Sequence, residues 1–143
     1  MLELRRLTDS FSVAPQIAPE DLADLRAQGF ALVINNRPEG EELGQPSGEE
    51  IEAAAHAAGL AYRAIPVAGG FSRPQVDEMA EAIDGVEGPV FAFCRSGTRS
   101  TLLWSLAQAS RGGNPDEIAE AAASAGYDIA PVRAAVEQLA ATS

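Results

Sequence analysis

One segment dictates the architecture: PVFAFCRSGTRSTLLWSLAQAS, residues 89–110. Its first part, Pro89 to Phe93, is apolar without alternating polar residues, which is typical of a strand buried on both faces. Residues 99–110 have the composition of a helix, and the polar segment between them contains a glycine that allows a tight loop. In α/β sheets, ligands bind beyond the carboxyl ends of the strands. Cys94 is therefore placed where a functional site is expected.

Apolar runs and helix signals alternate along the rest of the chain. Two capping patterns, Ser47 with Glu50 and Ser72 with Gln75, predict helix starts. We expect strands at residues 2–7, 13–17, 31–35 and 62–67, and helices at residues 19–28, 48–58, 72–83, from 114 onward and 131–141. This alternation predicts a three-layer α/β fold with a central, mostly parallel sheet flanked by helices. The length fits one domain over residues 1–143.

Composition restricts the classes of function. The net charge of −11 disfavours nucleic acid and anionic membranes as partners. No apolar run is long enough to span a bilayer, and no apolar stretch typical of a secretory signal follows the start, so a cytoplasmic location is expected. A single cysteine excludes an internal disulfide, and a single histidine, His56, makes a metal site improbable. We therefore expect no metal and no cofactor.

The loop after the buried strand combines features of an anion site. We expect a nest of backbone amides there, which the following helix N-terminus reinforces. The guanidinium of Arg99 can hold two oxygens, and the same positive field favours a thiolate at Cys94, the nucleophile. The hydroxyl of Ser100 can donate to that sulfur. Cys94 could instead be a small buried hydrophobe, but the polar, doubly basic loop favours chemistry. The predicted anion-binding residues are Arg95, Ser96, Gly97 and Thr98.

Three segments together resemble a known family. They are VINNRPEGEE (residues 33–42), GLAYRAIPV (59–67) and FCRSGTRS (93–100), which resemble the phosphatase-like domain of bacterial β-lactamase-hydrolase-like proteins. The resemblance spans residues 2–110 approximately. It implies a protein-tyrosine-phosphatase-like fold, with the nucleophile at Cys94 and the anion-holding arginine at Arg99. Some members of that family are fused to a persulfide-oxidising metallohydrolase, so the resemblance suggests such an enzyme as a partner.

Three departures from the phosphatase pattern favour sulfur transfer. Four residues separate Cys94 from Arg99, as in rhodanese-type sulfurtransferases, whereas these phosphatases have five. Phe93 replaces the usual histidine. The segment 68–70 (AGG) lacks the acid that protonates a leaving group, a loss of roughly two to four orders of magnitude in rate.

The expected function is thus a rhodanese-like sulfurtransferase. It would move sulfane sulfur from thiosulfate or a persulfide, through a Cys94 persulfide, to a thiol acceptor. One alternative is a tyrosine or dual-specificity-type phosphatase that hydrolyses phosphomonoesters through a Cys94 phosphocysteine. The other is a non-catalytic anion-binding module.

Other residues are candidates for the pocket wall. Arg37 lies after a strand at the same predicted sheet edge as Cys94, where it could line the pocket or equally anchor its loop. Residues 68–73 could form a mobile lid, because Gly69 and Gly70 loosen this segment, and Phe71 could cover the pocket. Asp77 and Glu78 could supply the missing acid, although a solvated helix face suits them better. The C-terminal helices are expected to be packing elements or, alternatively, a contact surface for a second subunit.

Overall fold

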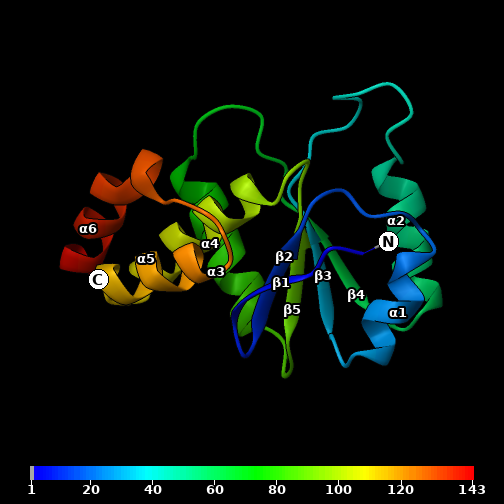
Figure 1. The fold of residues 1–143 in the computed structure, drawn as a ribbon, viewed down its shortest axis with the longest axis horizontal. Coiled ribbons are helices and arrows are strands. Elements are labelled where there is room, and N and C mark those ends of the chain that lie inside the picture. Colours follow the sequence, from blue (N-terminus) through cyan, green and yellow to red (C-terminus); the bar gives the residue numbers. More distant parts are fainter. Residues whose placement is uncertain (1) are drawn as a thin grey trace.

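A five-stranded sheet forms the centre of the molecule in a computed structural model that describes residues 2–143 (Figure 1). The strand order is β1-β2-β5-β3-β4. Only β1 is antiparallel to its neighbour, and the other pairs are parallel. The strands are β1 (Arg5–Thr8), β2 (Phe11–Ala14), β3 (Leu32–Asn35), β4 (Ala61–Ala64) and β5 (Val90–Phe93).

Helices cover both faces of the sheet. They are α1 (Asp21–Ala27), α2 (Gly48–Ala57), α3 (Arg73–Asp84), α4 (Thr98–Ser110), α5 (Pro115–Ser124) and α6 (Arg133–Thr142), with a 3-10 turn at Ala130–Val132. One face packs on α1 and α2, and the other on α3 and α4, with α5 and α6 outside them (Figure 1).

The central strand is buried on both faces, as its composition predicts. Phe91 and Phe93 join the apolar cluster of α1 and α2, whereas Val90 and Ala92 join that of α3 to α6. Each of the four residues is at most 1 % exposed. This packing confirms the three-layer α/β prediction. A strand with two apolar faces needs a helical layer on each side of the sheet.

Three predicted helix starts are confirmed in detail, whereas the helices predicted from residues 19 and 131 begin at Asp21 and Arg133. Ser47 with Glu50 and Ser72 with Gln75 form complete capping boxes at α2 and α3. At α5, the side chain of Asn114 accepts hydrogen bonds from two backbone amides of the first turn. These local contacts satisfy amides that have no partner within the helix.

Several strand bounds differ from the prediction. The strand predicted at residues 13–17 is β2, which ends at Ala14 because Pro15 has no N–H for a sheet hydrogen bond. The strand predicted to reach Val67 ends at Ala64, although the amides of Ile65 and Val67 still donate to the carbonyls of Asn35 and Asn36. In residues 2–143, no helix has the length and hydropathy to cross a membrane.

Candidate active site

Cys94 directly follows β5 at the carboxyl edge of the parallel strands. It is fully buried, and its Sγ accepts the Gly97 N–H at 3.1 Å. Gly97 has φ +89°, and a Cβ added there would collide with the Tyr127 hydroxyl. A glycine is therefore needed at this position, both for the left-handed turn and for the close approach of Tyr127.

Several backbone amides follow Cys94 in the loop that leads into α4. Gly97 and Thr98 already donate, to Cys94 Sγ and to Ser96 Oγ. Within residues 2–143, the amides of Arg95, Ser96, Arg99 and Ser100 have no acceptor. These four unpartnered donors at a helix N-terminus can serve an anion. Of the four anion-binding residues predicted from the sequence, Gly97 and Thr98 already use their backbone amides within the protein, whereas the amides of Arg95 and Ser96 remain available to an anion.

The hydroxyl of Ser100 is also without a partner. Its Oγ is buried and makes no hydrogen bond among the described residues. A buried hydroxyl without a partner costs roughly 1–3 kcal/mol. The predicted hydrogen bond from Ser100 to the sulfur is not made in this structure, so this role of Ser100 remains a prediction.

Two acceptors hold the guanidinium of Arg99. Its Nη1 donates to Glu41 Oε2 and to the Val67 carbonyl, both at 2.7 Å, and its Nη2 donates to Glu41 Oε1 at 2.8 Å. Three of its five N–H groups are thus used. The Nε–H and one Nη2–H remain on one edge of the plane, and this edge can still bind two oxygens of an anion.

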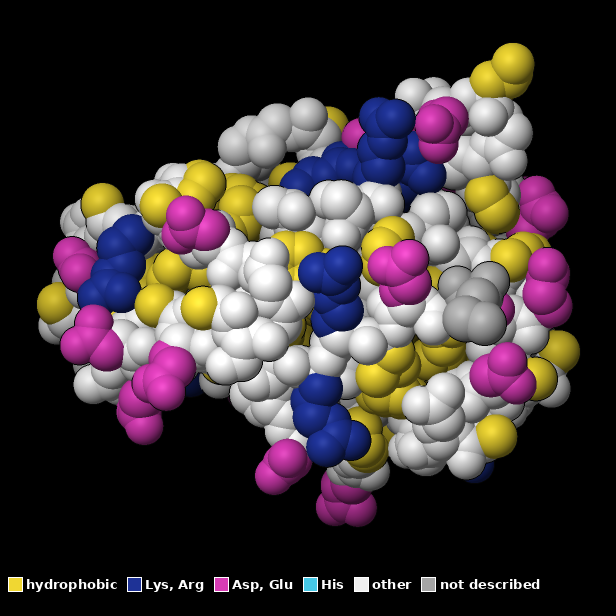
Figure 2. All heavy atoms as spheres, in the orientation of Figure 1, with side chains coloured by type: hydrophobic (Ala, Val, Ile, Leu, Met, Phe, Trp, Pro, Cys, Tyr) yellow, Lys and Arg dark blue, Asp and Glu magenta, His cyan; other side chains and the backbone are white. Residues whose placement is uncertain are grey.

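Two further arginines extend this contact through Glu41 and its neighbour Glu42. Arg37 is almost fully buried and donates to Glu41 at 2.9 Å, to Gln16 at 3.0 Å and to Glu42 at 3.3 Å. The exposed Arg95 donates to Glu42 at 3.3 Å. Figure 2 shows basic side chains gathered beside the loop between β3 and α2, with acidic side chains among them. Glu41 and Glu42 therefore bridge Arg37, Arg95 and Arg99 into one network.

This network determines the charge on Glu41. The hydrogen bond from Arg99, joined by that from Arg37, lowers the pKa of Glu41 from 4.5 to about 2. In return, the hydrogen bond to Glu41 raises the pKa of Arg99. Glu41 is consequently a carboxylate at neutral pH and cannot donate a proton to a leaving group.

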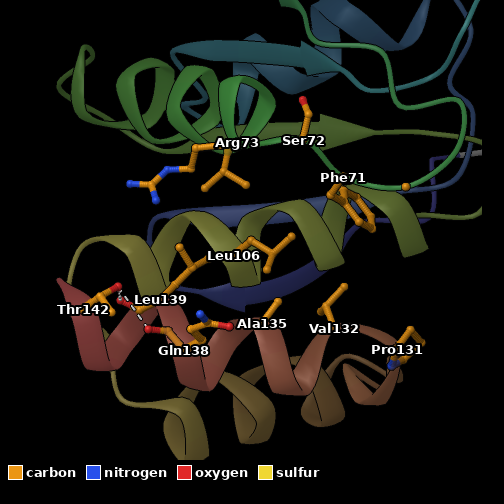
Figure 3. A pocket seen from close by; sticks show the side chains of 12 residues that line it. Phe71, Ser72, Arg73, Leu106, Pro131, Val132, Ala135, Gln138, Leu139 and Thr142 are labelled. Atoms are coloured by element: carbon orange, nitrogen blue, oxygen red, sulfur yellow. Dashed lines mark hydrogen bonds between the residues drawn. The ribbon is translucent and has the colours of Figure 1, made fainter.

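The other predicted pocket residues lie elsewhere. Gly70 and Phe71 line a groove of about 530 Å³ between the start of α3, α4 and α6 (Figure 3). Gly69 is not among its lining residues. Asp77 is exposed and pairs with Arg73 at 3.0 Å, which fits the solvated helix face preferred for it.

The sequence analysis did not single out Glu41, Glu42, Gln16 or Tyr127 as site residues. Glu41 could have been found, because it follows β3 at the same sheet edge as Cys94. Nothing in the sequence pattern points to Tyr127, whose hydroxyl donates to the Ser96 carbonyl at 3.0 Å. In the described chain, no three His, Cys, Asp or Glu side chains are placed to hold a metal ion.

The sheet order, the flanking helices and the cysteine before α4 define a protein-tyrosine-phosphatase-like domain. Its structure is similar to Tk-PTP in the active form, with a TM-score of 0.71, 19% identity and 96% of each chain covered. It is also similar to TpbA of P. aeruginosa in complex with pTyr, with a TM-score of 0.66, 15% identity, and 97% of this chain and 88% of that chain covered. At these identities the likeness concerns the fold alone.

The chain belongs to the phosphatase-like domain family of β-lactamase hydrolase-like proteins, which it matches over residues 3–111. A β-lactamase hydrolase-like protein of Agrobacterium fabrum is 40% identical over 108 residues, which are 75% of this chain and 25% of that protein. A candidate phosphatase from Neisseria meningitidis has 30% identity and a TM-score of 0.81, with 94% of this chain and 96% of that chain covered. The chain spans about a quarter of the length of its Agrobacterium relative.

Proposed function

We propose that this domain is a cysteine-dependent phosphatase that hydrolyses phosphomonoesters with good leaving groups, such as aryl phosphates. One observation carries the proposal. The Cys94 sulfur accepts a backbone N–H at the start of α4, and the neighbouring Arg99 keeps one guanidinium edge free. Membership of a phosphatase-like family and the Neisseria relative support the same chemistry.

The reaction proceeds in two displacements. The Cys94 thiolate attacks phosphorus, an S–P bond forms, and the ester P–O bond breaks with the electron pair leaving on the ester oxygen. Water then attacks the phosphocysteine, which releases inorganic phosphate and restores the thiolate. The free edge of Arg99 and the unpartnered amides bind the non-bridging oxygens and stabilise their charge in both steps.

The network around Arg99 limits the choice of substrate. Glu41 is held as a carboxylate by Arg99 and Arg37, and residues 68–70 contain no acid. The leaving oxygen therefore departs without a proton from either place, which a phenolate does more readily than an alkoxide. Rates should accordingly fall steeply from aryl to alkyl phosphates.

Sulfur transfer is the second candidate, favoured by the short loop. A loop with four residues between Cys94 and Arg99 encloses a smaller anion site than a loop with five, which suits a single sulfur atom. In addition, sulfite can leave thiosulfate without being protonated, so no general acid is needed. The thiolate would attack the outer sulfur of thiosulfate or of a persulfide, and the S–S bond would break as sulfite or a thiolate leaves. A thiol acceptor, or cyanide in an assay, then takes the sulfur from the Cys94 persulfide. A persulfide-oxidising metallohydrolase, fused to this domain or separate from it, could then use the persulfide formed on the thiol acceptor.

A paired assay separates the two candidates. Phosphate release from p-nitrophenyl phosphate and from an alkyl phosphate is measured beside thiocyanate formation from thiosulfate and cyanide, for wild type and Cys94→Ser. The proposal expects aryl phosphate hydrolysis that Cys94→Ser abolishes while thermal unfolding stays unchanged. Thiocyanate formation without phosphate release would replace it with sulfur transfer. Turnover retained by Cys94→Ser would remove the nucleophile, and inactivity towards all these substrates would favour an anion-binding module.

A further inference from the structure

We infer that Tyr127 is a positioning residue, which fixes the direction of the Ser96–Gly97 peptide group and so keeps its N–H on the Cys94 sulfur. This inference rests on the proposed role of Cys94 as the nucleophile, whether the substrate is a phosphoester or a sulfur donor. Tyr127 lies beyond residues 3–111, the part of the chain that matches the family.

The two ends of one peptide group carry the argument. The Ser96 carbonyl accepts the Tyr127 hydroxyl at 3.0 Å, and the Gly97 N–H donates to Cys94 Sγ at 3.1 Å. In a planar trans peptide the C=O and N–H point in opposite directions. A donor that holds the carbonyl on one side therefore holds the N–H on the other side, towards the sulfur.

This peptide group needs an external anchor. Gly97 adopts φ +89°, and glycine lacks the Cβ that restricts backbone rotation in other residues. If the peptide turned over, the Ser96 carbonyl oxygen would face the sulfur in place of the N–H. That change would replace a donor to the thiolate with a negative dipole end, which destabilises the charged form. The Tyr127 hydroxyl opposes this rotation.

Tyr127 is itself held in place by two neighbours. Its amide donates to the Ala122 carbonyl at the end of α5, and its side chain is largely buried. The guanidinium of Arg5, on the edge strand β1, lies 5.3 Å from the centre of the ring and also donates to the Ala125 carbonyl at 3.2 Å. The C-terminal segment is thus tied to β1 on one side and to the cysteine loop on the other.

The phenol remains a donor at neutral pH. Burial raises the pKa of Tyr127 above its ordinary value, Arg5 lowers it, and the charge of nearby Cys94 raises it. Because the net effect is upward from an ordinary value near 10, the hydroxyl keeps its proton in the range where a thiolate reacts.

The test is Tyr127→Phe, which removes one oxygen and keeps the ring that Arg5 contacts. The rate of Cys94 alkylation by iodoacetamide is measured from pH 5 to 10. We expect the midpoint of this profile to move to higher pH and the rate at mildly acid pH to fall roughly three- to tenfold, the effect of losing one hydrogen bond. The matched control is Tyr62→Phe, which removes the hydroxyl of the other tyrosine, on β4.

Three outcomes would overturn the inference, and none of them depends on turnover. A profile for Tyr127→Phe that coincides with wild type would overturn it, as would an equal shift in Tyr62→Phe. A second measurement follows the Gly97 amide by 15N NMR while Cys94 is titrated. We expect a large shift in wild type and a much smaller one in Tyr127→Phe; equal shifts in the two proteins would also overturn it. Absence of phosphate release by wild type would concern the proposed function alone.

Discussion

Replacing Glu41 with Gln tests the charge network that holds Arg99. The pKa of Glu41 falls from 4.5 to about 2, chiefly through its hydrogen bond from Arg99. A shift of that size corresponds to ~3.4 kcal/mol in favour of the folded state at neutral pH. Since 26% of the side chain is exposed, solvent screening reduces this to about 1–3 kcal/mol. Glu41→Gln should lower the free energy of unfolding at pH 7 by that amount.

The stabilisation that Glu41 provides should decrease as the pH falls. A carboxyl whose pKa is depressed by folding contributes its full stability above its ordinary pKa, here 4.5, and loses it as the pH falls through the folded value of about 2. Urea unfolding of wild type and Glu41→Gln should therefore differ most at pH 7, and the difference should shrink by more than half by pH 3. Glu78→Gln, at an exposed position on α3, is the control for removing a charge. A difference that is absent at pH 7, or equal at pH 7 and pH 3, would refute the network as a source of stability.

Two further predictions concern the cysteine loop. Ser100→Ala removes a buried hydroxyl that has no hydrogen-bond partner, so the variant should unfold at the same or a slightly higher temperature. If the hydroxyl donates to the thiolate during the reaction, Cys94 alkylation should also slow. A clear loss of stability would show that Ser100 has a structural role. Gly97→Ala places a Cβ at φ +89° and against the Tyr127 hydroxyl, so it should cost at least about 1 kcal/mol in urea unfolding and also slow alkylation. Wild-type values for Gly97→Ala in both measurements would contradict the description of this turn.

Much of the fold was predictable because its signals are local. The apolar run before Cys94 indicated a strand buried on both faces, and its residues do pack on two helical layers. Capping boxes act over three residues, so Ser47 and Ser72 marked the starts of α2 and α3 accurately. The strand bounds were less accurate. The end of β2 at Ala14 could have been predicted from Pro15, whereas the end of β4 depends on its pairing with β3, a separate segment of the chain.

The three-layer architecture could be predicted from local sequence signals, as could the position of Cys94, a glycine turn and Arg99 between a buried strand and a helix. The residues that surround them could not, because they are brought there by the folding of distant segments. Glu41 reaches Arg99 across 58 positions of sequence, and Tyr127 reaches the Ser96 carbonyl across 31. Such contacts depend on how loops and helix ends are arranged at one edge of the sheet, and no short-range sequence pattern predicts this arrangement. Hydrogen bonds of this kind form between residues that are close in space but distant in sequence, whereas helix caps and strand burial depend on residues that are neighbours in the sequence.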